Sequence, residues 1–145
     1  MFKPGNFMES KSNIRIAESH DLDQIQYADF LYDEGKLKEK ISRREIIVCD
    51  DNGQITGVLR YMWFWDYIPF INFIWVEEGF REEHRAIRMI QKLIEETEGK
   101  NYNRIMASTQ SDESAQGFFR KVGFEDAGGF TMKDQPFELI MINYL

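Results

Sequence analysis

The sequence predicts a single α/β domain in which a mixed β-sheet carries helices on both faces. Strand-like and helix-like patterns alternate along the chain, which favours this class over an all-α or all-β fold. The turn sequence Asp51-Asn52-Gly53 joins two strand patterns as a hairpin. A length of 145 residues suits one compact domain with its own core. We place this domain at residues 13–145 and interpret residues 1–12 as an N-terminal tail.

Strands are predicted where apolar side chains alternate with polar ones, or run together between turn residues. These segments are residues 13–18, 45–50, 54–65, 70–77, 104–109, 124–130 and 136–144. A turn over residues 66–69 is expected to separate the third strand from the fourth. The sheet therefore has about six or seven strands.

Helices are predicted where apolar side chains recur three or four residues apart. They are a short helix that begins at His20, and the segments 35–43, 82–98 and 111–122. Ser111 or Asp112 is expected to cap the last of these, and Gly123 follows it as a typical helix end. About four helices then flank the sheet, in the order β-α-α-β-β-β-α-β-α-β-β.

Composition and charge exclude several classes of function. The 18 Lys and Arg against 25 Asp and Glu give a formal charge of -7, whereas nucleic-acid and anionic-membrane binders need a basic surface. Cys49 is the single cysteine, so no intrachain disulfide or cysteine-based zinc site can form, and two histidines suggest no other metal site. We see no signal peptide and no apolar run of bilayer length. We expect a cytoplasmic protein with a mild preference for amine partners.

An apolar strand, a short loop and a long amphipathic helix follow one another over residues 71–94. The start of such a helix presents backbone N–H groups and the positive end of the helix dipole, which suit a phosphate or pyrophosphate. The charged residues of this helix are equally consistent with a solvated face.

Residues 111–125, SDESAQGFFRKVGFE, resemble the end of the fourth helix in the GNAT superfamily of N-acetyltransferases. There an apolar-aromatic pair precedes x-K-L-G-F-E, and here Phe118-Phe119 precedes residues 120–125. Residues 81–86 stand where the family has an R/Q-x-x-G-x-G/A loop, five residues beyond Val76. The resemblance covers residues 13–145.

The resemblance implies a mostly antiparallel sheet that splays between its fourth and fifth strands, where acetyl-CoA inserts. The backbone of the fourth strand would pair with the pantetheine arm, and the amides of the following loop would hold the pyrophosphate. The implied cofactor-binding residues are Ile74, Trp75, Val76, Arg81, Glu82, Glu83, His84, Arg85, Ala86, Asp112 and Phe119. No metal is implied, because the amine attacks the thioester directly.

Three departures from the family pattern matter. His84 replaces the first loop glycine, whose missing Cβ lets phosphate approach the backbone closely. Phe119 stands where many members carry a Tyr that protonates the departing thiolate. Glu82 and Glu83 would also repel phosphate. The cations expected to offset this repulsion are Arg81, Arg85, Arg88 and Lys92.

Asn72 and Glu77 are the candidates for catalytic work on the amine. Asn72 lies where family members often carry a carboxylate, and its amide can orient an amine but cannot accept its proton. Glu77 closes the strand and can act as a base through a water molecule. The alternatives are a hydrogen-bonded strand residue for Asn72 and a solvated surface residue for Glu77.

Eight aromatic residues fall between Tyr61 and Trp75, more than a small core easily takes. Tyr61, Trp63 and Trp65 share one face of a strand. Three interpretations stay open: core packing, a homodimer contact, and an aromatic wall that binds an amine by cation–π contact.

These observations predict an acetyl-CoA-dependent N-acetyltransferase that acts on a primary amine of a small molecule or peptide. The alternative is a non-catalytic acyl-CoA-binding or protein-interaction module on the same fold, which Phe119 and the altered loop favour. An α/β domain without a CoA site is the third interpretation.

Overall fold

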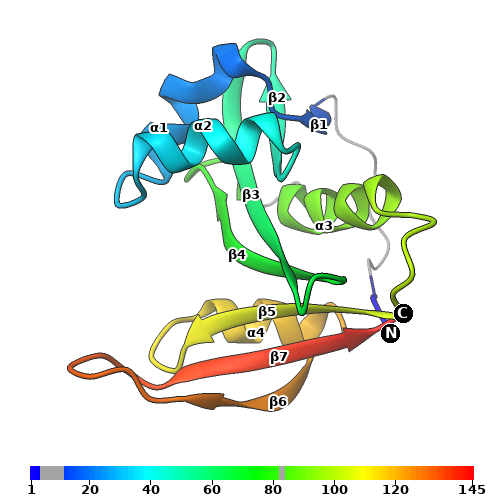
Figure 1. Ribbon diagram of the computed structural model, residues 1–145. Helices are drawn as coiled ribbons and strands as arrows, with labels where there is room; N and C mark the ends of the chain where they lie inside the picture. The colour runs from blue at the N-terminus through cyan, green and yellow to red at the C-terminus, as the bar shows by residue number, and fades with distance from the viewer. Residues whose placement is uncertain (4–11, 82–83) are drawn as a thin grey trace. The chain divides into compact units, whose positions relative to one another are not determined.

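The computed structural model describes residues 1–3, 12–81 and 84–145, and these form two compact units (Figure 1). Unit 1 comprises Met1–Gly5, Met62–Asn72 and Gly99–Leu145, and unit 2 comprises Asn6–Tyr61 and Phe73–Glu98. Of the segment interpreted as a tail, residues 4–11 lie outside the described residues. The backbone N–H of Lys3 donates to the Val122 carbonyl at 2.6 Å, which ties the first residues to unit 1.

The seven strands form one mixed sheet in the order β1-β2-β3-β4-β5-β7-β6. Only the pair β4–β5 is parallel among the strand pairs that the described residues define. The strands are β1 (Asn13–Ile16), β2 (Ile46–Asp51), β3 (Gln54–Phe64), β4 (Ile68–Val76), β5 (Arg104–Gln110), β6 (Glu125–Phe130) and β7 (Glu138–Tyr144). The mixed, mostly antiparallel sheet predicted from the sequence is confirmed.

Four α-helices and a short 3₁₀ turn occur among the described residues, in the predicted order. They are η1 (Ser19–Asp21), α1 (Leu22–Ala28), α2 (Glu34–Ser42), α3 (Arg85–Glu96) and α4 (Ala115–Lys121). The predicted cap of α4 at Ser111 or Asp112 is wrong, because α4 begins later and Ser114 is its N-cap residue. The Gln116 side chain donates to the Ser111 carbonyl at 2.8 Å and so holds the preceding residues in a turn.

The turn between β2 and β3 was predicted correctly from the sequence, whereas the turn between β3 and β4 was not. Asn52 and Gly53 take φ of 53° and 93°, which confirms the predicted two-residue turn. The turn expected over residues 66–69 comes earlier, because Trp65 and Asp66 take φ of 53° and 66°. Pro69 therefore lies inside β4. A turn with two positive φ angles normally has Asn-Gly or Asp-Gly at these positions, and Trp-Asp is not typical of it. The sequence therefore did not reveal this turn.

Unit 2 packs α1 and α2 on one face of its strands and α3 on the other (Figure 1). Leu37 of α2 belongs to the same buried cluster as Val48 of β2. The next strand residue, Cys49, points to the opposite face, where Met89 of α3 lies close to Gly57. Cys49 is fully buried, and this burial raises the pKa of its thiol to about 12. Cys49 is thus the buried small hydrophobe that its strand pattern indicates.

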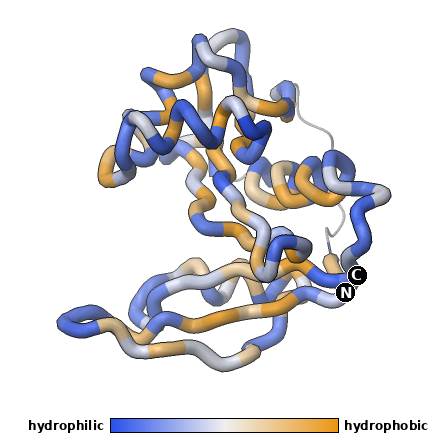
Figure 2. Tube along the Cα trace, viewed as in Figure 1, coloured by the Kyte–Doolittle hydropathy of each residue, from blue (hydrophilic) through white to orange (hydrophobic). Residues whose placement is uncertain are grey.

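Unit 1 is built around β5, which pairs with β7 along its whole length. Ile68 and Phe70 of β4 pack with Met106 of β5 in a buried cluster that Ile140 of β7 also contacts. Figure 2 shows β7 as a largely apolar strand. At the edge of the sheet, β6 has all six residues exposed.

Candidate functional site

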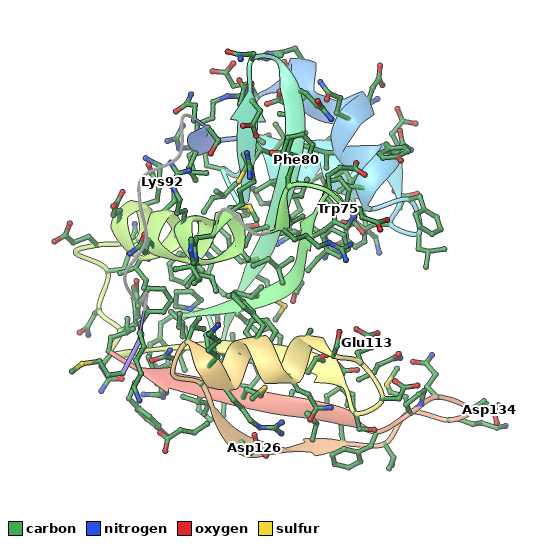
Figure 3. The ribbon with its side chains drawn as sticks, turned by 180° about the vertical axis from the view of Figure 1, so that it is seen from behind. Trp75, Phe80, Lys92, Glu113, Asp126 and Asp134 are labelled. Atoms are coloured by element: carbon green, nitrogen blue, oxygen red, sulfur yellow. The ribbon has the colours of Figure 1, made fainter. Side chains whose placement is uncertain are left out.

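The end of β4 presents its two faces to different surroundings. Phe73 and Trp75 pack against the buried cluster that α1 and α2 share, and Trp75 meets the ring of Tyr27 edge-on at 6.4 Å (Figure 3). Because side chains alternate along a strand, Ile74 and Val76 point to the opposite face. The residues predicted to pair with pantetheine are thus the last three residues of β4, which are half-buried and held by aromatic packing on one face of the strand.

The loop that follows β4 is closed by backbone hydrogen bonds. The N–H of Glu77 donates to the Thr56 carbonyl of β3 at 2.8 Å, and the N–H of Phe80 donates back to the Glu77 carbonyl at 3.0 Å. Arg85, the first residue of α3, donates from Nη1 to the Phe80 carbonyl at 2.9 Å. The start of α3 is therefore joined to this loop at Phe80, and the beginning of the loop is joined to β3.

Arg85 is a buried structural cation. It donates from Nη2 to Asp51 Oδ1 at 2.9 Å and from Nε to Asp51 Oδ2 at 3.2 Å, and only 2% of Arg85 is exposed. Burial by itself raises the pKa of the Asp51 carboxyl, but hydrogen bonds from Arg85 and Thr56 outweigh it and hold the pKa below its ordinary value. A bidentate pair of this kind fixes the orientation of both groups.

His84 is the residue immediately before α3, and its backbone is left-handed, with φ 59° and ψ 28°. Its carbonyl accepts the first helical hydrogen bond, from Arg88 N at 3.0 Å. A residue with a Cβ is strained in this conformation, whereas glycine adopts it readily. The family glycine at this position therefore has a conformational reason in addition to close approach to phosphate.

The cations expected to face a phosphate have different partners in the structure. Arg85 binds Asp51, Arg88 donates to Ser12 Oγ at 2.6 Å, and Lys92 pairs with Glu96 at 3.1 Å. Arg81 stays exposed and donates from Nε to the Val76 carbonyl at 3.0 Å. Of these four cations, Arg81 is the exposed one, whereas Arg85 is buried and the other two are half-buried. Glu82 and Glu83 lie outside the described residues.

The start of α3 fits an anionic group such as the pyrophosphate of CoA. Its first turn includes Arg85 and Ala86, whose N–H groups precede the first residue that can bond back within the helix. The helix is 12 residues long, so its dipole favours an anion at this end. Exposed Arg81 adds a cation on the preceding loop. Among the described residues, the Cβ of His84 opposes close approach.

Two expected site residues of unit 1, Asp112 and Phe119, lie after the end of β5 and on α4. Asp112 is exposed in the turn before α4. Phe119 is only 2% exposed and packs between Phe118 and Phe124, with ring centroids 5.5 and 5.0 Å away. The ring at the family's Tyr position is therefore a core side chain of unit 1.

Asn72 and Glu77 belong to different units, Asn72 to unit 1 and Glu77 to unit 2. Both side chains are half-buried. Among the described residues, the Asn72 side chain forms no hydrogen bond and Glu77 forms no ion pair, whereas Asp51 is paired with Arg85. Both side chains keep their polar atoms available to a ligand.

Sequence reasoning also missed the buried ion pair between Arg60 of β3 and Asp29 after α1. Arg60 Nε lies 2.8 Å from Asp29 Oδ2, and the guanidinium lies 3.7 Å from the ring centre of Tyr32. This pair fastens the segment between α1 and α2 to the strands of unit 2. The available signal was a charged residue inside an otherwise apolar strand.

The family model described as "Acetyltransferase (GNAT) family" matches residues 12–124. The chain belongs to the GNAT acetyltransferase family. The family recognised from residues 81–86 and 118–125 is thereby confirmed, and with it the enzyme class, an acetyl-CoA-dependent N-acetyltransferase. No curated protein matches the chain.

Solved structures share this GNAT fold over nearly the whole chain. A GNAT acetyltransferase from Bacillus cereus ATCC 10987 is 22% identical with a TM-score of 0.75, covering 93% of this chain and 98% of its own. Ard1 from Thermoplasma volcanium is 14% identical with a TM-score of 0.83, and the match covers 94% of this chain and 99% of the Ard1 chain. The PaiA N-acetyltransferase from Thermoplasma acidophilum, in complex with coenzyme A, is 12% identical with a TM-score of 0.77, covering 94% and 100%.

In residues 1–3, 12–81 and 84–145, no group of three or more His, Cys, Asp or Glu side chains gathers as a metal site would require. No helix in the described part of the chain has the length and apolar character needed to cross a membrane.

Proposed function

We propose that this GNAT protein transfers an acetyl group from acetyl-CoA to a primary amine of a small molecule or a peptide. The observation that carries the proposal is the buried Arg85, which ties the start of α3 to Asp51 and to the Phe80 carbonyl. A helix start that is held in place before the ligand arrives suits a pyrophosphate, because little conformational freedom is then lost on binding.

The backbone of Ile74, Trp75 and Val76 serves the pantetheine arm in this proposal, and the amides of residues 81–86 serve the pyrophosphate. Arg81 Nε donates to the Val76 carbonyl in the unliganded chain. An arm that uses this carbonyl displaces Arg81, whose guanidinium then becomes available to the phosphates. Bound acetyl-CoA supplies the acetyl thioester.

Asn72 orients the amine through its amide oxygen, and Glu77 accepts the amine proton through a water molecule. Phe119 has no proton to give, so water protonates the departing thiolate. Asp112 serves the cofactor from the turn before α4. Since acetyl-CoA must be at hand, we place the enzyme in the cytoplasm.

The first test is acetyl-CoA binding, followed by thermal unfolding. At a ligand concentration about 100-fold above the dissociation constant, the free energy of unfolding rises by about 2.7 kcal/mol. Arg81→Glu weakens binding because it places an anion beside the phosphates, whereas Lys36→Gln, an exposed change on α2, does not. If millimolar acetyl-CoA causes no shift in the unfolding temperature, the proposal is overturned.

The second test is release of the CoA thiol in the presence of a panel of amines: polyamines, amino acids and peptides with free N-termini. Asn72→Ala and Glu77→Gln each lower turnover if these residues act on the amine. The Glu77 change is expected to cost about 100-fold or more for a general base. The amine that supports release of the CoA thiol identifies the class of acceptor.

A non-catalytic acyl-CoA-binding module is the second candidate function, and the buried ring of Phe119 favours it. This candidate predicts acetyl-CoA binding without thiol release for any amine. It also predicts that Asn72→Ala and Glu77→Gln leave binding unchanged. Thiol release above the uncatalysed rate excludes it.

A further inference from the structure

Unit 1 contains a pocket of about 570 Å³, and none of its lining residues is among those assigned to acetyl transfer above. Its lining residues come from the hairpin between β3 and β4 and from the segment that leads into β5. They are Trp63, Asp66, Tyr67, Lys100 and Asn101. Two of these side chains are aromatic, one is a carboxylate, one an ammonium and one an amide.

This pocket and the unit 1 residues of the proposed CoA site lie at opposite ends of β5. The pocket residues precede Arg104, the first residue of β5, whereas Asp112 follows Gln110, the last. A strand of seven residues spans roughly 20 Å. The pocket is therefore a separate site.

The aromatic side of the pocket is held by neighbouring rings and a cation. Trp63 is half-buried, and its ring meets that of Tyr102 at 6.4 Å in an edge-on arrangement. Arg104 Nη2 donates to the Tyr67 hydroxyl at 2.8 Å, and its guanidinium lies 5.7 Å from the centre of the Tyr67 ring. Because this hydroxyl accepts from Arg104, its own proton points elsewhere and can be donated to a ligand.

The turn that carries Asp66 adopts an unfavourable backbone conformation. Both Trp65 and Asp66 have positive φ, in a hairpin position that normally takes Asn-Gly. Such strain persists only where the surrounding structure fixes it, and it tends to occur at functional sites. Here it places Asp66 at the pocket.

Asp66 and Lys100 carry opposite charges and line the same pocket, yet no ion pair joins them in the described part of the chain. Both side chains are exposed. A ligand with only a negative charge would be repelled by the Asp66 carboxylate, and one with only a positive charge would be repelled by the Lys100 ammonium. A neutral sugar would use neither charge. Two separate opposite charges beside aromatic rings match a small molecule that carries both signs and an apolar part.

We propose that this pocket binds a free α-amino acid with an apolar side chain, in its zwitterionic form. The ammonium pairs with Asp66, and the carboxylate pairs with Lys100 and accepts from the Tyr67 hydroxyl. The apolar side chain packs on Trp63. No covalent step is involved, and the binding is independent of acetyl-CoA.

The test is titration of the full chain with L-leucine in the absence of acetyl-CoA, followed by the indole N–H resonance of Trp63 and by calorimetry. N-acetyl-L-leucine lacks the ammonium and L-leucinamide lacks the carboxylate. Each analogue is expected to bind about two- to fivefold more weakly than L-leucine, because both protein charges are exposed. Equal binding of all three, or no binding up to about 10 mM, overturns the proposal.

Two variants assign the charges. Asp66→Asn abolishes the preference for L-leucine over N-acetyl-L-leucine, and Lys100→Gln abolishes the preference over L-leucinamide. Asn tolerates positive φ, so the first variant keeps the turn. Asp23→Asn and Lys36→Gln remove the same charges from exposed positions on α1 and α2 and leave both preferences intact. If the pocket variants behave like these controls, leucine binds elsewhere, for example at the acceptor site, and the proposal is wrong.

Discussion

The guanidinium of Arg85 binds the carboxylate of Asp51 through two hydrogen bonds, 2.9 Å from Nη2 and 3.2 Å from Nε. Arg85 begins α3 and Asp51 ends β2. The same guanidinium donates to the carbonyl of Phe80 and lies 4.9 Å from the centre of its ring (Figure 3 labels Phe80). One buried side chain thus positions a helix start, a strand end and the loop after β4, all within unit 2.

Arg85→Gln is expected to lower the free energy of unfolding by about 3 kcal/mol, the lower end of the range for removing one partner of a buried ion pair. The lower end applies because the Asp51 side chain keeps 20% of its surface in contact with solvent. Urea unfolding measures the change. Arg120→Gln, which removes the exposed pair with Asp126, is the control and should lower stability much less. Equal effects of the two variants would show that burial does not matter here.

The Asp51 interaction also predicts how stability depends on pH. The folded pKa of Asp51 lies below its ordinary value of 3.8, so its contribution is complete at neutral pH and is lost as the pH falls through the folded pKa. The difference in unfolding free energy between the parent and Asp51→Asn should therefore shrink below about pH 4. Unfolding series from pH 7 to pH 2.5 measure it. A difference that grows on acidification contradicts the assignment.

His84→Gly is expected to stabilise the chain by about 1 kcal/mol, because glycine adopts the left-handed conformation of this residue without strain. The same change removes the Cβ that opposes phosphate, so acetyl-CoA should bind more tightly. His84→Ala loses the imidazole but keeps a Cβ, and it serves as the matched control. Calorimetry and thermal unfolding measure both effects. If alanine tightens binding as much as glycine, the imidazole and not the backbone was the obstacle.

Gly57→Ala is expected to cost about 1–3 kcal/mol, as overpacking of a core typically does. A Cβ at this position would lie 3.0 Å from both Cys49 Sγ and Met89 Cε. Gly117→Ala on α4 is the control, because nothing lies within 4 Å of a Cβ there. Alanine in a helix is favoured over glycine, so this control should stabilise by about 0.5–1 kcal/mol. Urea unfolding of both variants decides whether α3 needs this close approach.

Phe119→Tyr is expected to lower stability by about 1–3 kcal/mol without raising turnover, because its hydroxyl would be buried among aromatic rings without a partner. Phe118→Tyr is the control, since Phe118 is half-buried and a hydroxyl there reaches solvent more easily. CoA-thiol release at saturating acetyl-CoA measures turnover. A several-fold rise for Phe119→Tyr would restore this position as the place of the missing acid.

Local patterns determined most of the fold. The order of strands and helices follows from periodicity, because alternation and helical spacing are properties of neighbouring residues. The family followed from residues 81–86 and 118–125, where side-chain types stand at fixed spacings. The turn at Asn52-Gly53 was readable for the same reason, since glycine and asparagine favour positive φ by themselves.

Tertiary structure decided the rest, because contacts between distant residues leave no local pattern. Arg85 was expected to face phosphate, but Asp51, 34 residues away, takes it into a buried pair. The strained turn at Trp65 and Asp66 opposes local preference and exists only because the sheet on either side fixes it. The burial of Phe119 depends on Phe118 and Phe124 closing around it. The sequence by itself determined which elements form and which family they build. Packing decided which charges are buried and which stay available to a ligand, because the energy of a charge depends on its surroundings.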